Sequence, residues 1–345
     1  MKDLIVIILS DFAAITRETL SLQLLCRAPQ TGTPEALDSD IIPAVRPDPE
    51  AAPRAGLSRV RRRTGPHAPS FRCMMPLPSP DAPATIDLAG RAILITGATG
   101  GLGRHVALAC ASRGATVVLH GRVVRKLEAL YDEIVAAGYP QPTILPLDLA
   151  TAGPDDYGNV AAAIRAQLGC LDGIAHAAAL LGSLGPVEHQ AFDAWLKVLR
   201  VNVVAAMALT RATAPLLAAA PDAGVVFTLD ARGQAPRAYW GAYAAAKAAL
   251  GAFATTLADE WESRPNLRVN AVVPGPIDSP LRAQTHPGEE RTLLPAPAAL
   301  ASLYVYLLGT QPKSGSGMLV DAQAWLAGRP ASTPLVPDPG SSARP

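Results

Sequence analysis

Tyr243 and Lys247 are the two residues whose types and spacing most directly suggest chemistry. They stand four positions apart in the segment 242–247, AYAAAK, so on a helix both side chains leave the same face. A phenol titrates at about 10 and is a poor proton donor near neutrality, whereas a neighbouring ammonium group stabilises its phenolate. The pair therefore indicates acid–base catalysis, although a Tyr and a Lys at this spacing also occur as a simple surface pair.

A glycine-rich segment upstream supplies the second chemical signal. Residues 96–103, TGATGGLG, follow a β-branched run and precede an apolar stretch with helical spacing. Glycines at a strand-to-helix turn let the backbone approach a pyrophosphate, and the free N–H groups of the helix face the anion. This context favours a dinucleotide site over a merely tight turn. The residues expected at the cofactor are Gly97, Thr99, Gly101, Leu102 and Gly103.

Short β-branched runs, alternating with Ala-rich amphipathic stretches, must position these two segments. This alternation is typical of a parallel sheet covered by helices. The runs expected to form strands are 91–96, 115–120, 142–147, 171–176, 223–229, 267–273 and 317–321. We therefore predict an α/β fold, a Rossmann-type doubly wound, seven-stranded parallel sheet with helices on both faces.

The spacing of Gly97, Gly101 and Gly103 after a threonine resembles the signature of the short-chain dehydrogenase/reductase family. The resemblance implies that Tyr243 and Lys247 are catalytic and also contact the cofactor. It implies that Asn202 bends its helix and holds a water for proton relay, the alternative being a purely structural hydrogen bond. The further cofactor contacts that it implies are Asp148, Leu149, Ala178, Pro274, Gly275, Ile277 and Ser279. For Asp148 the alternative is a helix cap.

The end of the second predicted strand bears on which dinucleotide is bound. An acidic residue there would hydrogen-bond a ribose 2′-hydroxyl, but the sequence has His120, Gly121 and Arg122. The Arg122 guanidinium can hold a 2′-phosphate by charge-assisted hydrogen bonds, which favours NADP(H) over NAD(H). Many NADP(H)-using relatives also carry a basic residue before the second signature glycine; here that residue is Gly100, and NAD(H) is the alternative.

Asp230 occupies the position, thirteen residues before Tyr243, where relatives carry a catalytic serine. An ionised carboxylate there would oppose phenolate formation and repel an oxyanion, whereas a protonated one could donate a hydrogen bond to the substrate oxygen. Alternatively Thr228, on the same strand face, could supply a hydroxyl, or Arg232 could neutralise the acid. The sequence leaves these alternatives open.

Two other segments depart from the family pattern. Residues 176–179 read HAAA where relatives usually read NNAG, and 320–323, VDAQ, lacks the usual paired glycines. The segments 240–243, WGAY, and 180–182, LLG, resemble the YciK-like bacterial oxidoreductases. The family resemblance implies an NADP(H)-dependent interconversion of an alcohol and a carbonyl in a small or medium organic substrate. The alternative is an NADP(H)-binding regulatory or scaffold protein with little or no turnover.

Composition argues against several other classes of protein. A net charge of +1 provides no field that would attract nucleic acid. Four scattered cysteines and unclustered histidines predict neither a metal site nor a disulfide framework. Without a run of about 18 apolar residues we expect no membrane span. We expect a cytoplasmic homodimer or homotetramer, because the helices near 190–216 and 241–263 carry more Ala and Leu than one sheet face needs.

Proline-rich segments are expected to flank a single domain over 84–327. Residues 1–83 are predicted to be a disordered extension, and 328–345 a disordered tail. Met74 and Met75 stand just before the ordered pattern, so a later start codon would remove that extension.

Overall fold

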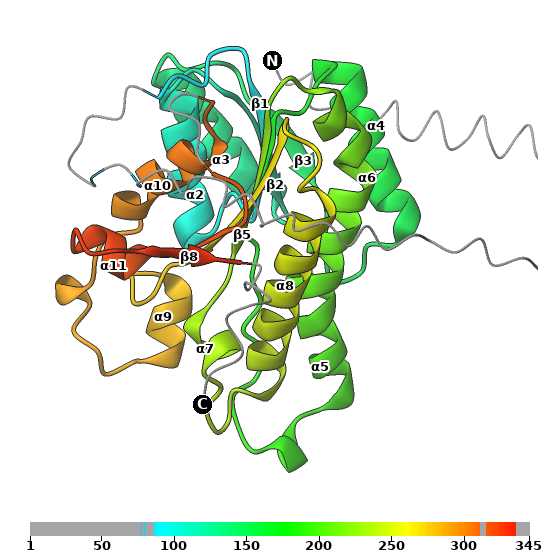
Figure 1. The fold of residues 1–345 in the computed structure, drawn as a ribbon. Helices are drawn as coiled ribbons and strands as arrows, with labels where there is room; N and C mark the ends of the chain where they lie inside the picture. The colour runs from blue at the N-terminus through cyan, green and yellow to red at the C-terminus, as the bar shows by residue number, and fades with distance from the viewer. Residues whose placement is uncertain (1–76, 78, 80–85, 311–314, 336–345) are drawn as a thin grey trace, which may run out of the picture. The chain divides into compact units, whose positions relative to one another are not determined.

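The computed structural model describes residues 77, 79, 86–310 and 315–335. Apart from residues 77 and 79, the extension predicted over 1–83 lies outside the described residues, as does 336–345. Within the described part, eight strands form one sheet in the order β3-β2-β1-β4-β5-β6-β7-β8 (Figure 1). The strands are β1 (Ala92–Thr96), β2 (Thr116–Gly121), β3 (Thr143–Pro146), β4 (Gly173–His176), β5 (Ala223–Thr228), β6 (Leu267–Val273), β7 (Met318–Asp321) and β8 (Ser332–Pro334).

Helices cover both faces of this sheet. One layer contains α2, α3 and α10, and the other contains α4, α6 and α8 (Figure 1). The helices are α2 (Gly101–Ser112), α3 (Val124–Ala136), α4 (Pro154–Leu168), α5 (Phe192–Leu199), α6 (Ala205–Ala219), α7 (Ala231–Gln234), α8 (Gly241–Glu260), α9 (Pro280–Thr285), α10 (Ala298–Leu308) and α11 (Ala322–Leu326). Shorter helical turns are η1 (Val187–His189), η2 (Arg200–Val204) and η3 (Arg291–Leu293).

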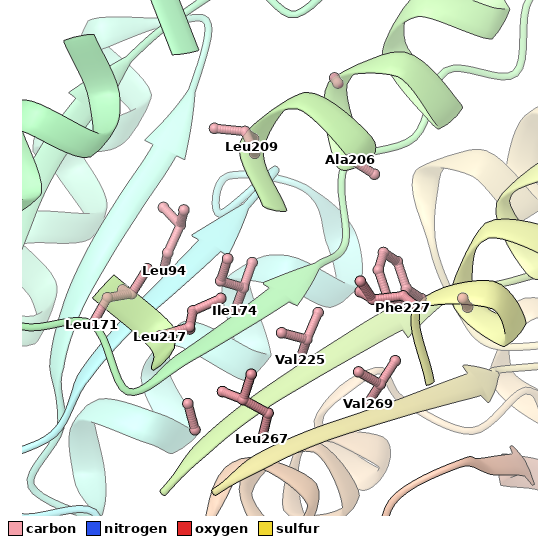
Figure 2. Close-up of a cluster of buried hydrophobic side chains, with 14 of the residues drawn as sticks. Leu94, Leu171, Ile174, Ala206, Leu209, Leu217, Val225, Phe227, Leu267 and Val269 are labelled. Carbon is pink, nitrogen blue, oxygen red and sulfur yellow. The ribbon is translucent and has the colours of Figure 1, made fainter. Parts of the chain in front are cut away.

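The strands are hydrophobic on both sides because both sides are covered. On the α6 face, Leu94, Ile174, Val225 and Val269 come from four neighbouring strands and pack in the same core as Leu209 of α6 (Figure 2). Burial of these apolar side chains holds the helices against the sheet. The core therefore fixes the C-terminal strand ends, where the chemically interesting residues stand.

The predicted α/β fold and its seven parallel strands are confirmed, and the sheet has one strand more than predicted. Residues 332–334, which we placed in the disordered tail, form β8, which pairs antiparallel with β7. The pairing is reinforced by Leu335, whose buried side chain belongs to the core and whose N–H bonds the Gly317 carbonyl at 2.6 Å. A three-residue edge strand that contains Pro334 carries no recognisable strand pattern in the sequence.

Two described segments, Phe192–Ala219 and Arg291–Leu308, are long and apolar enough to cross a membrane by length and composition alone. In the structure 44% and 50% of their most apolar stretches are buried against the rest of the protein. We interpret both as core helices, because one face of each packs on the sheet.

At the amino-terminal ends of the strands, opposite the chemically interesting residues, two buried arginines bond the C-terminal end of α10. The Arg268 guanidinium, 1% exposed, donates to the carbonyls of Leu307 (2.7 Å) and Gly309 (2.8 Å) and bonds Asp222 at 2.6 Å. Arg91 donates to the Leu308 carbonyl at 3.0 Å. The two cations satisfy carbonyl groups that a helix end leaves without partners.

We expect Arg268→Met to lower the free energy of unfolding by about 3–5 kcal/mol, because it removes the cation that bonds the Leu307 and Gly309 carbonyls and the nearer of the two cations beside Asp222. The matched control is Arg104→Met, which breaks the half-exposed pair with Glu133 and should cost less than about 1 kcal/mol. Urea unfolding of both variants measures the difference. Equal losses would show that the buried network contributes no more than a surface pair.

Candidate active site

Tyr243 and Lys247 leave α8 toward the end of β5, and each side chain is buried, with 3% exposed. The Tyr243 hydroxyl donates a 3.0 Å hydrogen bond to Oδ2 of Asp230. The Lys247 ammonium group donates one of 2.7 Å to the Thr228 carbonyl, and its Nζ lies 5.8 Å from the centroid of the Tyr243 ring. The structure thus brings three of the four predicted catalytic residues together at one strand end.

The charges around Tyr243 oppose its ionisation. Burial raises the pKa of Tyr243 above its ordinary value, and the Asp230 carboxylate raises it further. Burial lowers the pKa of Lys247 to about 8, and Asp230 partly offsets this effect. We expected Lys247 to lower the Tyr243 pKa, but in this structure the ammonium group bonds a carbonyl while the phenol bonds a carboxylate. The readiness of Tyr243 to release its proton therefore depends on Asp230.

Asp230 is held at both carboxylate oxygens. Oδ2 accepts from Tyr243, and Oδ1 accepts from the Arg232 N–H at 2.8 Å, which makes Asp230 the N-cap of α7. The alternative role for Thr228 is wrong, because its hydroxyl lies 2.9 Å from that of Tyr304 on α10, in the opposite helix layer. Arg232 meets Asp230 through its backbone, while its guanidinium lies over the Trp240 ring.

Asn202 stands in a π-helical turn, η2, that interrupts the helix between α5 and α6. Its Oδ1 accepts from the Leu180 N–H at 3.0 Å, and its Nδ2 donates to the Leu180 carbonyl at 2.8 Å and the Val198 carbonyl at 2.9 Å. The expected irregularity of this helix is therefore present, and π-turns are frequent at functional sites. Asn202 also lines a cavity of about 10 Å³ with Thr96 and His176, close to the lower limit for one water molecule.

The glycine-rich turn has the shape that a dinucleotide needs. Gly97 has a φ of 66°, and a Cβ there would lie 2.8 Å from the Cα of Ala178. A Cβ at Gly103 would lie 2.3 Å from the Gly97 carbonyl oxygen. Helix α2 then begins with no side-chain cap and no acidic residue in its first turn, so the dipole and amide groups at its N-terminus, around Leu102, can take a pyrophosphate.

The remaining residues predicted for the cofactor lie around this turn. A Cβ at Gly101 would lie 3.2 Å from Ser279 Cβ, and the Ser279 hydroxyl caps α9 by accepting from the Arg282 N–H at 3.2 Å. The Ala178 N–H donates to Thr96 Oγ1 at 3.1 Å. Thr99 lies beside the end of β2, since its Oγ1 would be 3.4 Å from a Cβ placed at Gly121. These contacts bring segments from four parts of the chain to one edge of the sheet.

Three predicted cofactor residues are more enclosed. Oδ1 of Asp148 accepts from the Ala150 N–H at 3.0 Å, which closes a turn over 148–151 and is not the helix cap we considered, since Gly153 is the N-cap of α4. Leu149 is buried in the core, and Ile277 is buried in the loop between β6 and α9. Any contact of Leu149 or Ile277 with a cofactor would therefore be made largely through the backbone.

The end of β2 fits the phosphate of a dinucleotide. Arg122 is exposed directly after Gly121, and no ion pair is found for it within the described part of the chain. His120 is buried with both ring nitrogens lacking a hydrogen-bond partner among the described residues, and burial lowers its pKa to about 4. An orphaned imidazole next to an available guanidinium is consistent with a polar ligand bound at this strand end.

The sequence did not reveal Gln323 as a site residue. Its Nε2 donates to the carbonyls of Pro274 (2.7 Å) and Pro276 (3.0 Å) and so holds the loop after β6, in which we predicted cofactor contacts. A Cβ at Gly275, where φ is 67°, would lie 2.4 Å from Gln323 Cγ. The available signal was the segment 320–323, which we noted only for its missing glycines.

Comparisons with known proteins agree with this geometry. The family model described as short chain dehydrogenase matches residues 91–290. The chain belongs to the short-chain dehydrogenase family. YciK, an uncharacterized oxidoreductase of Escherichia coli (strain K12), is 40% identical over 233 residues, which span 68% of this chain and 92% of the relative. The resemblance to the YciK-like oxidoreductases is therefore confirmed, and this short-chain dehydrogenase is an oxidoreductase of a family that binds a nicotinamide cofactor.

Two solved structures are similar to this short-chain dehydrogenase. One is a short chain dehydrogenase of Escherichia coli CFT073 complexed with NADPH, with 39% identity, a TM-score of 0.65 and coverage of 68% of this chain and 97% of that chain. The other, from Shigella flexneri 2a str. 301, is complexed with NADP and has 38% identity, a TM-score of 0.66 and coverage of 68% and 98%.

We expect Gly103→Ala to weaken NADPH binding by at least about tenfold, because the new methyl group displaces the turn that must receive the pyrophosphate. Gly158→Ala is the matched control: nothing lies within 4 Å of its Cβ, so it should leave binding unchanged and stabilise α4 by about 0.5–1 kcal/mol. NADPH fluorescence titration and thermal unfolding measure the two effects. Unchanged binding in Gly103→Ala would contradict the proposed cradle.

Proposed function

We propose that this protein is an NADP(H)-dependent oxidoreductase that interconverts an alcohol and a carbonyl group in a small or medium organic substrate. The observation that carries the proposal is the contact of buried Tyr243 and Lys247 with the end of β5 and half-buried Asp230, beside the glycine cradle at the end of β1. In an open parallel sheet, ligands bind in the crevice at the carboxyl ends of the strands.

The preference for NADP(H) is supported by the end of β2. Gly121 stands where an acidic residue would hydrogen-bond the ribose 2′-hydroxyl of NAD(H). The exposed guanidinium of Arg122 follows it. A planar guanidinium binds a phosphate by paired, charge-assisted hydrogen bonds. The two similar short chain dehydrogenases were solved with NADPH and with NADP.

Within this proposal the bound nicotinamide supplies or accepts the hydride, and the chain handles the proton. The Tyr243 hydroxyl, which donates to Asp230, turns to the substrate oxygen and gives it a proton during reduction. During oxidation it takes that proton back. The Lys247 ammonium group, held by the Thr228 carbonyl, stabilises negative charge on the phenol oxygen. Asn202 has a positioning role: its side chain fixes the backbone at Leu180 by two hydrogen bonds.

Asp230 sets how well this proton transfer works. An ionised Asp230 beside Tyr243 opposes the phenolate that forms when the proton leaves. A protonated Asp230 keeps the same oxygen–oxygen contact and can donate to the substrate oxygen. Turnover is then favoured in the state in which Asp230 carries a proton.

A second candidate function follows from the same contact. The hydrogen bond from Tyr243 to Asp230 and the raised pKa of Tyr243 suit a protein that binds NADP(H) but turns it over little or not at all. Such a protein would act as a regulator or scaffold that responds to the dinucleotide. Both candidates predict NADPH binding, and only the first predicts consumption of NADPH with carbonyl compounds.

Tyr243→Phe is expected to lower the turnover of carbonyl probes by about 10²-fold or more, because the proton donor is lost. NADPH binding should remain, since the phenyl ring fills the same space. Steady-state rates over a panel of aldehydes, ketones and acyl thioesters, together with an NADPH titration, test this expectation. NADPH binding without turnover of any compound by the natural chain would support the second candidate.

Asp230→Asn removes the charge and keeps the shape: the amide oxygen can still cap α7, and the amide NH2 takes the place of Oδ2 and donates to the Tyr243 hydroxyl. If the ionised carboxylate opposes catalysis, the variant should be faster than the natural chain at neutral pH. Asp230→Ser should be faster in the same way. Slower turnover in both variants would show that the acid works as a donor.

The pH profile of turnover should fall above about pH 8, because Lys247, whose pKa burial lowers to about 8, loses its positive charge there. Below that pH the ammonium group is present and stabilises charge on Tyr243. The measurement is kcat against pH at saturating NADPH, with NADPH affinity followed over the same range as the control. A kcat that stays level to pH 9.5 would contradict a cationic role for Lys247.

A further inference from the structure

The side chains of Arg232 and Trp240 stack on each other beside Tyr243, the proposed proton donor. Arg232, in α7, is half-buried, and its guanidinium carbon lies 4.8 Å from the centroid of the Trp240 ring. The Trp240 ring in turn lies 5.8 Å from that of Tyr243. Stacking on an aromatic face orients a guanidinium and leaves its N–H edges free for an acceptor.

The backbone at Arg232 and next to Trp240 is fixed by hydrogen bonds. The Arg232 N–H donates to Oδ1 of Asp230 at 2.8 Å. Tyr239, just before Trp240, has a φ of 74°, the only positive φ of a residue other than glycine among those described. Its carbonyl accepts from the Gly185 N–H at 3.0 Å, which ties the loop to the segment after β4. Strain of this kind persists where the surroundings require one conformation, and it concentrates at functional sites.

Arg232 differs from Arg282 and Arg291 in having no anionic partner among the described residues. Arg282 bonds Glu289 through two contacts of 2.5 and 2.6 Å, and Arg291 pairs with Asp278 at 2.5 Å. For the Arg232 guanidinium no ion pair or hydrogen bond is found within residues 86–310 and 315–335. A half-buried guanidinium with free N–H edges is a ready receptor for an oxyanion.

We propose that Arg232 makes this site selective for carbonyl and hydroxyl compounds that carry an oxyanion, a carboxylate or a phosphate, a few bonds from the reacting carbon. This inference rests on the proposed oxidoreductase function and names the substrate class of the same site. Arg232, held against the Trp240 ring, binds the oxyanion by a paired contact.

The test compares para-formylbenzoate, its neutral methyl ester and para-formylphenyl phosphate, each with NADPH. We expect at least one of the two anions to exceed the ester by about tenfold in kcat/KM, mainly through a lower KM, because a charge-assisted contact is made before the transition state as well as in it. The anion that gives the larger ratio identifies the oxyanion. Arg232→Met should bring the ratio of anion to ester close to one.

Arg237→Met is the matched control, because Arg237 is an exposed arginine of the same loop whose carbonyl accepts from the Trp240 N–H. It should leave the ratio as it is in the natural chain. Equal rates for the ester and both anions in the natural chain would overturn the proposal. So would an unchanged ratio in Arg232→Met.

A binding measurement separates this inference from the proposed function. If none of the three compounds is turned over, the panel of aldehydes, ketones and acyl thioesters decides the oxidoreductase proposal. Calorimetric titration of the NADPH complex with para-formylbenzoate and para-formylphenyl phosphate still tests Arg232. Binding of either anion by the natural chain that is lost in Arg232→Met and kept in Arg237→Met supports the receptor. Absence of binding of both anions to the natural chain overturns it.

Discussion

The Lys247 ammonium group is buried, and a buried cation must be given hydrogen-bond partners. The partner here is the carbonyl of Thr228, the last residue of β5, and this contact sets how closely α8 approaches the sheet. Gly233 makes the approach possible on the other side, because a Cβ there would lie 2.7 Å from the Lys247 carbonyl carbon. The proposed active site is thus built around one cation whose position strand, helix and turn determine together.

Asp230 connects the turn beside Lys247 to the Tyr243 hydroxyl. One of its oxygens caps α7, which begins shortly after β5 ends. The other accepts a hydrogen bond from the Tyr243 hydroxyl, the group that the family uses for proton transfer. A carboxylate where the family pattern has serine places a group that opposes ionisation beside the Tyr243 hydroxyl. The same cap places the Arg232 backbone, so the position of its guanidinium over Trp240 follows from the position of Asp230.

Much of this arrangement was predictable from local patterns. The seven parallel strands, the glycine turn and the Tyr243–Lys247 pair each depend on short spacings, which a helix or strand converts directly into a shared face. The missed parts depend on distant partners. Strand β8 exists because β7 offers an open edge and Leu335 reaches the core, and Gln323 matters because the loop at Pro274 lies beside it. Thr228 illustrates the same limit, since its hydroxyl meets Tyr304, seventy-six residues away in the chain.

The sequence by itself determined the fold class, the cofactor turn and the proton-handling pair, because periodicity and glycine geometry are local properties of a chain. Only the tertiary structure decided what surrounds each charge: a carbonyl for Lys247, a phenol for Asp230, a tryptophan face for Arg232. The physical reason is that burial and electrostatic neighbours set the pKa of a group, and both arise only when segments far apart in sequence pack together.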